Sequence, residues 1–221
     1  MEKYVLIVAG GKGSRFDGIT PKQFALIKGK PVLLHTFEAF LRSDKSLHFI
    51  LVLSDSKSVE NWKSICKKHH FYNFHKIVLG GESRQQSVQS GLAKIPDNVL
   101  IAIHDGVRPI VAQRLIKEGF ELASKRGSAV PVIEITETVR QIKSGSNIVI
   151  DRKNLSLVQT PQFFQSNLIK QAYNNINRSD FTDDASIYEN AGFKLTFFAG
   201  ERQNLKITYP IDLLIAKALL S

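Results

Sequence analysis

Residues 4–16, YVLIVAGGKGSRF, join an apolar run of strand length to a loop rich in glycine and basic residues. The run YVLIVA at 4–9 is typical of a buried strand, and a second basic cluster, TPKQF, follows at 20–24. Glycines let the backbone approach a ligand closely, and successive exposed N–H groups bind anions. The opening of the chain therefore predicts a strand that ends in a loop able to hold phosphate groups.

Apolar runs of strand length alternate with helical patterns up to residue 135. Strands are predicted at residues 4–9, 47–54, 75–80, 99–105 and 128–135, and helices at 31–41, at 84–95, around Trp62 and around Phe120. This alternation is typical of an α/β, Rossmann-like fold with a mostly parallel sheet and helices on both faces. Such sheets bind ligands at the carboxyl ends of their strands. The candidate binding loops are therefore 10–21, 80–84 and 104–109.

The pattern changes after residue 135. Residues 137–160, ETVRQIKSGSNIVIDRKNLSLVQT, are predicted to form two extended pieces around a KSGSN turn. An isolated hairpin is marginally stable in water, so we expect this arm, at about 137–158, to pack on another surface such as a second subunit. A helix near 166–176, a strand KLTFFAG at 194–200 and an amphipathic terminal helix are predicted to follow. We predict one domain over residues 1–221 with a protruding β-arm.

The composition excludes several classes of protein. No apolar run reaches the roughly 20 residues that span a bilayer, and the start is unlike a signal peptide. The single cysteine, Cys66, excludes an internal disulfide and favours a reducing compartment, so we expect a cytoplasmic protein without a membrane partner. The net charge of +10 fits either solubility or an anionic partner. Lysine and arginine are scattered and no nucleic-acid recognition pattern is present, which favours a small anionic substrate.

The opening loop matches neither common phosphate-binding motif. It lacks the P-loop pattern, and Phe16 stands where the dinucleotide fingerprint GxGxxG requires its third glycine. A tight turn with solvated basic residues is the alternative interpretation. Glycines combined with cations at the end of the first strand instead predict a polyphosphate-binding loop, whose candidate residues are Gly10, Gly11, Gly13, Lys12, Arg15 and Lys22.

Two further loops carry candidate residues. In GGESRQQSV (80–88), glycines can bring the backbone against the edge of a base, although a simple turn with Ser83 as helix cap explains the same residues. In HDGVRP (104–109), Asp105 follows a buried strand. That carboxylate is a candidate for a ribose hydroxyl or Mg²⁺, or it pairs with Arg108. We expect His104 to be a packed strand residue and not a metal ligand.

Other candidates lie far along the chain. Arg152 is in the arm, and Lys206 lies between two apolar residues in NLKITYP, so its side chain should point away from both. A solvated cation is the alternative interpretation for each. Hydroxyl and carboxylate candidates of lower specificity are Thr138, Thr160, Thr182 and Asp183.

Together these stretches resemble one enzyme family. The motifs VAGGKGSRF, PKQF, GGESRQQSV, HDGVRP, DRKNLSLVQTPQFF, FTDDAS and NLKITYPID are similar in order and spacing to those of the 2-C-methyl-D-erythritol 4-phosphate cytidylyltransferases. The resemblance covers about residues 4 to 220. It implies transfer of a cytidylyl group from CTP to the sugar-alcohol phosphate, with release of pyrophosphate, in isoprenoid precursor synthesis. It also implies Mg²⁺ and a homodimer that exchanges its arms.

The resemblance implies roles for individual residues. The nucleotide side of the site would be formed by Ala9, Gly10 and Gly11 at the cytosine and phosphates, Arg15 and Lys22 at the triphosphate, and Gly81, Glu82 and Ser87 at the base. Asp105 and Arg108 would lie near the ribose, metal and acceptor. The acceptor phosphate would be held by Thr138, Arg152, Thr160, Thr182 and Lys206, with Arg152 serving the neighbouring subunit. The metal ligands stay unassigned, with Asp105 as the candidate.

Some positions depart from the family pattern. Alanine is common in the family at Gly10 and Gly106, and aspartate at Glu82; these changes are mild if the backbone makes the contacts. The ribitol 5-phosphate cytidylyltransferases share the opening loop, PKQF, the HD-VRP motif and TPQ. Asp151, Arg152 and the arm pattern favour methylerythritol phosphate. Glucose-1-phosphate-type and molybdopterin-type nucleotidyltransferases share the opening loop but need neither the arm nor NLKIT. A dinucleotide-binding regulatory module is the non-enzymatic alternative, and the absence of the third glycine and of an acidic residue about 20 positions on weighs against it.

Overall fold

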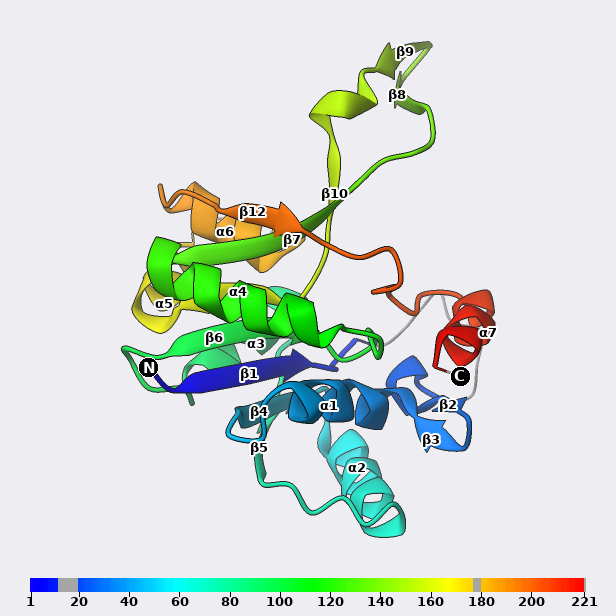
Figure 1. The fold of residues 1–221 in the computed structure, drawn as a ribbon, viewed down its shortest axis with the longest axis vertical. Coiled ribbons are helices and arrows are strands. Elements are labelled where there is room, and N and C mark those ends of the chain that lie inside the picture. The colour runs from blue at the N-terminus through cyan, green and yellow to red at the C-terminus, as the bar shows by residue number, and fades with distance from the viewer. Residues whose placement is uncertain (12–19, 177–179, 221) are drawn as a thin grey trace.

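A single eight-stranded sheet organises the chain. The computed structural model describes residues 1–11, 20–176 and 180–220. Within these ranges the strands of the sheet are β1 Lys3–Val8, β4 His48–Leu53, β5 His75–Leu79, β6 Leu100–Asp105, β7 Ser128–Glu134, β10 Ser156–Val158, β11 Gln162–Gln165 and β12 Phe197–Ala199. Their order is β10-β7-β11-β6-β1-β4-β5, and β12 pairs with β7 (Figure 1).

The centre of the sheet is parallel, as the sequence predicts. β1 pairs in parallel with β4 and β6, and β4 pairs in parallel with β5. Val8 at the end of β1 lies opposite Val52 on β4 and Asp105 on β6. The loops that follow these strands therefore leave the sheet at the same edge, which is where ligands bind in such folds.

The sequence pattern does not predict β11, which makes one side of the sheet mixed. β11 lies between β6 and β7 and is antiparallel to both. β10 is also antiparallel to β7, whereas β12 is parallel to it. The four residues of β11 are too few for a recognisable period. Phe163 and Phe164 nevertheless anchor it, because each ring is buried in the core on a different face of the sheet.

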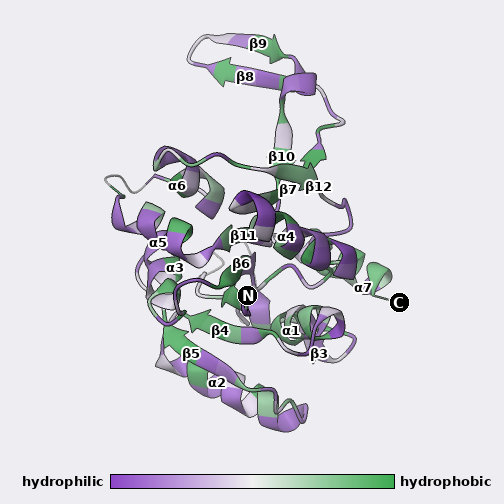
Figure 2. Cartoon of the chain, turned by 60° about the vertical axis from the view of Figure 1, so that its left-hand side comes forward, coloured by the Kyte–Doolittle hydropathy of each residue, from purple (hydrophilic) through white to green (hydrophobic). Residues whose placement is uncertain are grey.

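Helices cover both faces of the sheet. They are α1 Val32–Ser43, α2 Ser56–Lys68, α3 Arg84–Leu92, α4 Gln113–Arg126, α5 Ser166–Asn174, α6 Asp184–Asn190 and α7 Pro210–Leu219. Alternate residues of β1 serve the two cores: Val5 and Ile7 pack with α1, α2 and α4, whereas Leu6 packs with α3, α5 and α6. Figure 2 shows hydrophobic residues concentrated along β4 and β6, while α2 carries both kinds. None of the helices in the described ranges combines the length and apolar character of a membrane span.

Short polar side chains start three of these helices. Asp55 accepts a hydrogen bond from the N–H of Ser58 at the start of α2, and Asp183 accepts one from Ser186 at the start of α6. Ser83 accepts one from the N–H of Gln86 at the start of α3. The predicted helix cap at Ser83 is therefore confirmed, and it places the 80–84 loop directly before the first turn of α3.

A hairpin stands apart from the main sheet. β8 Val139–Lys143 and β9 Ser146–Ile150 pair with each other as a separate two-stranded sheet. Gly145 lies at the turn with a φ of 79°, which favours glycine. Figure 1 shows the hairpin projecting from the end of the molecule where β10 lies. Its turn falls within the KSGSN stretch, inside the segment that the sequence predicts to be an arm.

Two segments differ from the prediction. Residues 204–208, around Lys206, do not form a strand, because they cross over the loop after β6: the N–H of Ile207 donates to the carbonyl of Val107 at 2.9 Å. The predicted alternation still holds, since Lys206 is exposed and Ile207 is buried. FTDDASIYENAG, which carried no prediction of a helix, contains α6. Between β1 and α1, the short strands β2 Leu26–Ile27 and β3 Lys30–Pro31 pair with each other, close in sequence to the 3₁₀ helix η1 Lys22–Phe24.

Gly119 on α4 allows the helix to lie directly on the ring of Phe163. A Cβ at this position would come within 2.1 Å of the ring, which is fully buried. We therefore expect Gly119→Ala to lower the free energy of unfolding by about 1–3 kcal/mol, despite the better helix propensity of alanine. Denaturant unfolding measures the change. Ser124→Ala on the exposed side of α4 is the control. The additional change Phe163→Leu should recover part of the stability lost in Gly119→Ala. Unchanged stability in Gly119→Ala contradicts this packing.

Candidate active site

The three candidate loops meet at one cavity of about 930 Å³ at the carboxyl edge of the parallel strands. Gly10 and Gly11 follow β1, residues 80–84 follow β5, and Asp105 ends β6. Ser54 and Asp55 line the cavity from the end of β4. The sequence prediction that these loops converge is confirmed for the described residues. Arg15, Lys12 and Gly13 lie outside those residues.

A second, smaller cavity of about 270 Å³ adjoins the first. Arg84, Asp105 and Lys206 line both cavities, so they mark the junction. The residues that line only the smaller cavity are mostly polar: Arg108, Val158, Gln159, Thr160, Gln162, Thr182, Asp183 and Ser186. The two cavities therefore provide a larger and a smaller compartment that share one charged boundary.

Lys22 and Ala9 form the wall nearest β1. Lys22 begins η1 and lines the larger cavity. The next side chain, Gln23, is buried, and its Nε2 donates to the carbonyl oxygen of Ala9 at 3.0 Å. This hydrogen bond ties the PKQF segment to the end of β1. It therefore fixes the backbone that carries Lys22 beside the glycine loop.

The 80–84 loop is closely packed against α3. A Cβ on Gly80 would lie 2.5 Å from Oγ of Ser87, and one on Gly81 would lie 2.5 Å from Cβ of Gln86. Oγ of Ser87 accepts from the N–H of Gly81 at 3.2 Å and donates to the carbonyl of Ser83 at 2.9 Å. The N–H of Glu82 donates to Oε1 of Gln86 at 2.8 Å. Glycines are thus required for close approach, and these side chains hold the loop in shape.

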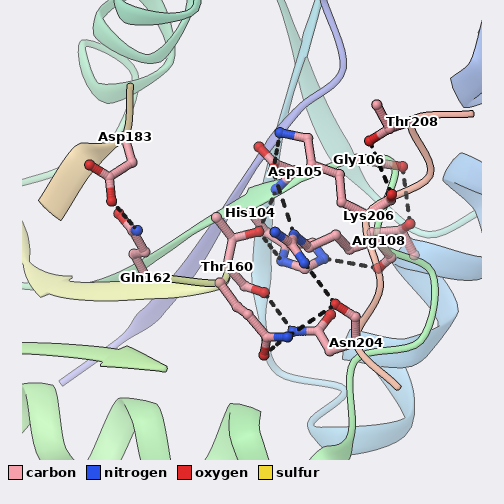
Figure 3. Close-up of polar contacts among 12 residues, drawn as sticks. His104, Asp105, Gly106, Arg108, Thr160, Gln162, Asp183, Asn204, Lys206 and Thr208 are labelled. Carbon is pink, nitrogen blue, oxygen red and sulfur yellow. Dashed lines mark hydrogen bonds and ion pairs between the residues drawn. The ribbon is translucent and has the colours of Figure 1, made fainter. Parts of the chain in front are cut away.

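Asp105 lies among three cations, of which Figure 3 labels Lys206 and Arg108. Nζ of Lys206 lies 2.8 Å from Oδ2 of Asp105, and Nε of Arg108 lies 3.6 Å from the same oxygen. Nε of Arg84 lies 3.6 Å from Oδ1. The predicted pair with Arg108 is therefore confirmed. Asp105 also lines both cavities, and its binding to a ribose hydroxyl or Mg²⁺ stays a prediction.

The charges of this cluster stabilise one another. Burial alone would raise the pKa of the Asp105 carboxyl, but Arg84, Lys206 and Arg108 together hold that pKa well below its usual range. Burial alone would lower the pKa of the Arg84 guanidinium, but Asp184 and Asp105 raise it. Asp105 and Arg84 therefore stay ionised at neutral pH at the junction of the two cavities.

His104 holds the loop that carries Asp105 and Arg108. Its Nε2 lies 3.1 Å from the carbonyl oxygen of Arg108, which can only accept, so Nε2 carries the proton. Nδ1 then accepts from Oγ1 of Thr160 at 3.2 Å, and the same oxygen accepts from the N–H of Asp105 at 3.1 Å. Burial lowers the pKa of His104 to about 4. The prediction of a packed strand histidine is confirmed, and His104 is a neutral brace for the site.

Most of the predicted site residues converge. Those that line one or both cavities are Ala9, Gly10, Gly11, Lys22, Gly81, Glu82, Ser87, Asp105, Arg108, Thr160, Thr182 and Lys206. Thr138 and Arg152 line neither cavity, because they belong to the arm segment that projects away from the sheet (Figure 1). The guanidinium of Arg152 instead donates to the carbonyl of Thr136. A single chain therefore does not bring these two residues to the site.

Comparison with known proteins identifies the family of this chain. The family model described as 2-C-methyl-D-erythritol 4-phosphate cytidylyltransferase matches residues 4–221. The chain belongs to this cytidylyltransferase family. A relative of the same name from Azobacteroides pseudotrichonymphae is 45% identical over 220 residues, which cover 99% of each chain. The one from Bacteroides thetaiotaomicron is 44% identical over the full length of both.

Solved structures of cytidylyltransferases have the same fold. The crystal structure of 2-C-methyl-D-erythritol 4-phosphate cytidylyltransferase from Thermus thermophilus superposes with a TM-score of 0.81, at 29% identity, and covers 99% of this chain and 98% of that one. The 4-diphosphocytidyl-2C-methyl-D-erythritol synthase from Anaerococcus prevotii gives 0.83 at 27% identity, with the same coverage. The α/β fold with a mostly parallel sheet is therefore that of the cytidylyltransferase family.

Two charged residues of this cytidylyltransferase, Arg84 and Asp184, are not among the predicted site residues. Arg84 lies in GGESRQQSV and Asp184 in FTDDAS, two of the motifs that carry the family resemblance. Arg84 is partly buried between Asp105 and Asp184, and Asp184 is fully buried. One feature of the sequence does point to Arg84: it is the first residue of the helix after the 80–84 loop, where a positive charge opposes the helix dipole. Such an unfavourable placement indicates a specific anionic partner.

The described residues offer few ligands for a metal ion. No group of three or more His, Cys, Asp or Glu side chains gathers within the described ranges. Asp105 is the predicted candidate, and its two oxygens already contact three cations. One carboxylate ligand is compatible with Mg²⁺ when substrate phosphates and water supply the other ligands, which is a common arrangement for this ion.

Proposed function

We propose that this chain transfers a cytidylyl group from CTP to 2-C-methyl-D-erythritol 4-phosphate and releases pyrophosphate. The observation that carries the proposal is the pair of adjoining cavities, whose shared boundary holds Arg84, Asp105 and Lys206. The larger cavity, of about 930 Å³, has room for a nucleotide, and the smaller, of about 270 Å³, suits a phosphorylated alcohol. Their junction is where the two phosphates react.

The reaction needs no nucleophilic side chain. A phosphate oxygen of the acceptor attacks the α-phosphorus of CTP, a new phosphorus–oxygen bond forms, and the bond to the β-phosphate oxygen breaks to release pyrophosphate. The acceptor oxygen is already ionised at neutral pH, so no general base is required. The main barrier is the mutual repulsion of two anions, which fixed cations and amide dipoles lower. Holding both reactants in line lowers it further.

The residues of the two cavities have distinct roles in this scheme. Backbone N–H groups near Gly10 and Gly11 meet the triphosphate, and Lys22 neutralises it. Arg15, which the family resemblance assigns to the triphosphate, would add to that neutralisation. Lys206 and Arg108 face the acceptor phosphate from the other side of the junction. Bound Mg²⁺ would be held by the phosphates, water and at most the Asp105 carboxylate, and would supply additional neutralisation of charge.

Pyrophosphate release tests the activity. The wild-type chain is incubated with CTP, Mg²⁺ and 2-C-methyl-D-erythritol 4-phosphate, and pyrophosphate and the cytidine diphospho-alcohol are quantified. Ribitol 5-phosphate in place of the acceptor tests the alternative, and EDTA tests the need for a divalent cation. Transfer to ribitol 5-phosphate alone would replace the proposed acceptor, and undiminished transfer in EDTA would remove the metal from the scheme.

We also propose a homodimer that exchanges its arms, acting in the cytoplasm, where the free thiol of Cys66 stays reduced. The hairpin exposes Ile142, Ile148 and Val149 by 82%, 56% and 58%. A projecting hairpin with exposed apolar side chains is marginal in water unless another surface covers it. Exchange would bring Arg152 to the acceptor cavity of the neighbouring subunit, which the single chain leaves without it.

Arg152→Ala is expected to raise KM for the acceptor about tenfold, with little change in KM for CTP, because only the acceptor phosphate loses a charged partner. Arg140→Ala, on an exposed residue of the same hairpin, is the control and should change neither. Mixing Arg152→Ala with Lys22→Ala protein should restore activity, because an exchanged dimer then contains one intact site. A higher KM for CTP alone, or no recovery on mixing, contradicts the exchange.

A further inference from the structure

Asp184, at the start of α6, is a carboxylate behind the site. It is fully buried and lines neither cavity. Arg84 donates two hydrogen bonds to it, from Nη1 to Oδ1 at 3.1 Å and from Nη2 to Oδ2 at 2.6 Å. Tyr173 on α5 donates a third, from its hydroxyl to Oδ1 at 2.6 Å. A buried carboxylate is stable only when it is paired and hydrogen-bonded, so Asp184 and Arg84 form a fixed unit.

The remaining nitrogen of the Arg84 guanidinium faces the site. Its Nε lies 3.6 Å from Oδ1 of Asp105, and the side chain lines both cavities. The network therefore runs from Tyr173 in the core, through Asp184 and Arg84, to Asp105 at the junction. Because the two Nη atoms are bound to a buried partner, Arg84 cannot follow an anion that enters either cavity.

The three cations around Asp105 differ in their freedom to move. Arg84 is held by Asp184, and Nη1 of Arg108 donates to the carbonyl of Asn204 at 2.7 Å. The side chain of Lys206 is 41% exposed, against 28% for Arg84 and 11% for Arg108. Lysine carries a point charge on a flexible chain. A phosphate that enters the smaller cavity therefore draws Lys206 away from Asp105 more easily than it draws either arginine.

We propose that Asp184 is a positioning residue that keeps Arg84 beside Asp105, so that Lys206 can turn from Asp105 to the acceptor phosphate. Without a fixed counter-charge, the buried Asp105 carboxylate would retain Lys206 as its partner, or Arg84 would move onto the phosphate in a different geometry. This inference rests on the proposed function. It gives the buried Asp184–Arg84 pair a role in acceptor binding in addition to any contribution to the stability of the fold.

Asp184→Asn tests the proposal because it keeps the size of the side chain and removes its charge. We expect KM for 2-C-methyl-D-erythritol 4-phosphate to rise by about tenfold or more, with KM for CTP within about twofold of the wild type. A residue that only stabilised the fold would reduce the amount of active enzyme, and so the apparent kcat, without changing either KM. An unchanged KM for the acceptor in folded Asp184→Asn protein overturns the proposal.

A second variant keeps the test decisive if Asp184→Asn does not fold, and a double-mutant cycle extends the test if it does. Tyr173→Phe removes one hydrogen bond to Asp184 and should raise KM for the acceptor about two- to threefold. Arg84→Gln combined with Asp184→Asn should be no worse than Arg84→Gln alone, because the pair acts as a unit. Additive effects in that cycle, or a wild-type KM for the acceptor in Tyr173→Phe, count against the network.

The matched control is Asp97→Asn, which removes an exposed carboxylate paired with Lys170 at 2.6 Å and should change neither KM. Wild-type protein is assayed first. If it transfers no cytidylyl group, the proposed function fails and the inference with it. If it does, and Asp184→Asn and Tyr173→Phe bind the acceptor as the wild type does, only the inference fails.

Discussion

Lys22→Ala is expected to lower kcat for cytidylyl transfer by about a hundredfold or more, which corresponds to about 3 kcal/mol of transition-state stabilisation. Lys22 lines the larger cavity beside the glycine loop, and Gln23 anchors its backbone to the end of β1 through Ala9. Negative charge accumulates on the leaving pyrophosphate as its bond to the α-phosphorus breaks. A cation held at this wall therefore contributes more in the transition state than in the bound substrate.

Steady-state kinetics with CTP and the acceptor measure this effect. Lys63→Ala on the exposed face of α2 changes the net charge by the same amount and should leave kcat unaltered. Thermal unfolding of each variant shows whether the fold is intact. Near-normal turnover by folded Lys22→Ala protein would refute the role of Lys22 in the reaction.

Lys206→Met is expected to reduce kcat/KM for the acceptor by about a hundredfold or more. Methionine retains the length of the side chain and removes the charge. Lys206 is the most exposed of the three cations around Asp105, and it lines both cavities. Without the Lys206 charge, Asp105 stays paired with Arg84 and Arg108. The smaller cavity then lacks the cation that can most easily turn from Asp105 to a phosphate.

The fold should tolerate Lys206→Met, because a partly exposed ion pair contributes on the order of 1 kcal/mol or less. Lys217→Met on the exposed face of α7 is the control. Activity is measured over a range of acceptor concentrations at saturating CTP. If kcat/KM for the acceptor stays within about threefold of the wild type, Lys206 does not hold the acceptor phosphate.

Local patterns determined much of this protein. Apolar runs and helical periods predicted β1, β4, β5, β6 and β7 and the helices between them, because each pattern reflects burial along one short element. The rule that parallel sheets bind ligands at their carboxyl ends then identified the three loops that meet at the larger cavity. The resemblance of the motifs supplied the chemistry of the family.

Local patterns failed where partners lie far apart in the chain. β11 has only four residues and is defined by its pairing with β6 and β7. Residues 204–208 are apolar and polar in alternation like a strand, but contacts to the loop after β6 hold them in irregular form. The arm residues Thr138 and Arg152 were assigned to the site by resemblance, and one chain alone does not place them there.

The two neighbouring aspartates in FTDDAS show the difference between what the sequence determines and what only the tertiary structure decides. The sequence by itself determined an α/β sheet, its loops and a cluster of cations for phosphates, because these follow from short-range burial, glycine geometry and charge. Only the tertiary structure decided that Asp183 caps a helix while its neighbour Asp184 is the buried partner of Arg84, 100 residues away. An ion pair depends on where two distant segments meet in space, and no local period in either segment records that meeting.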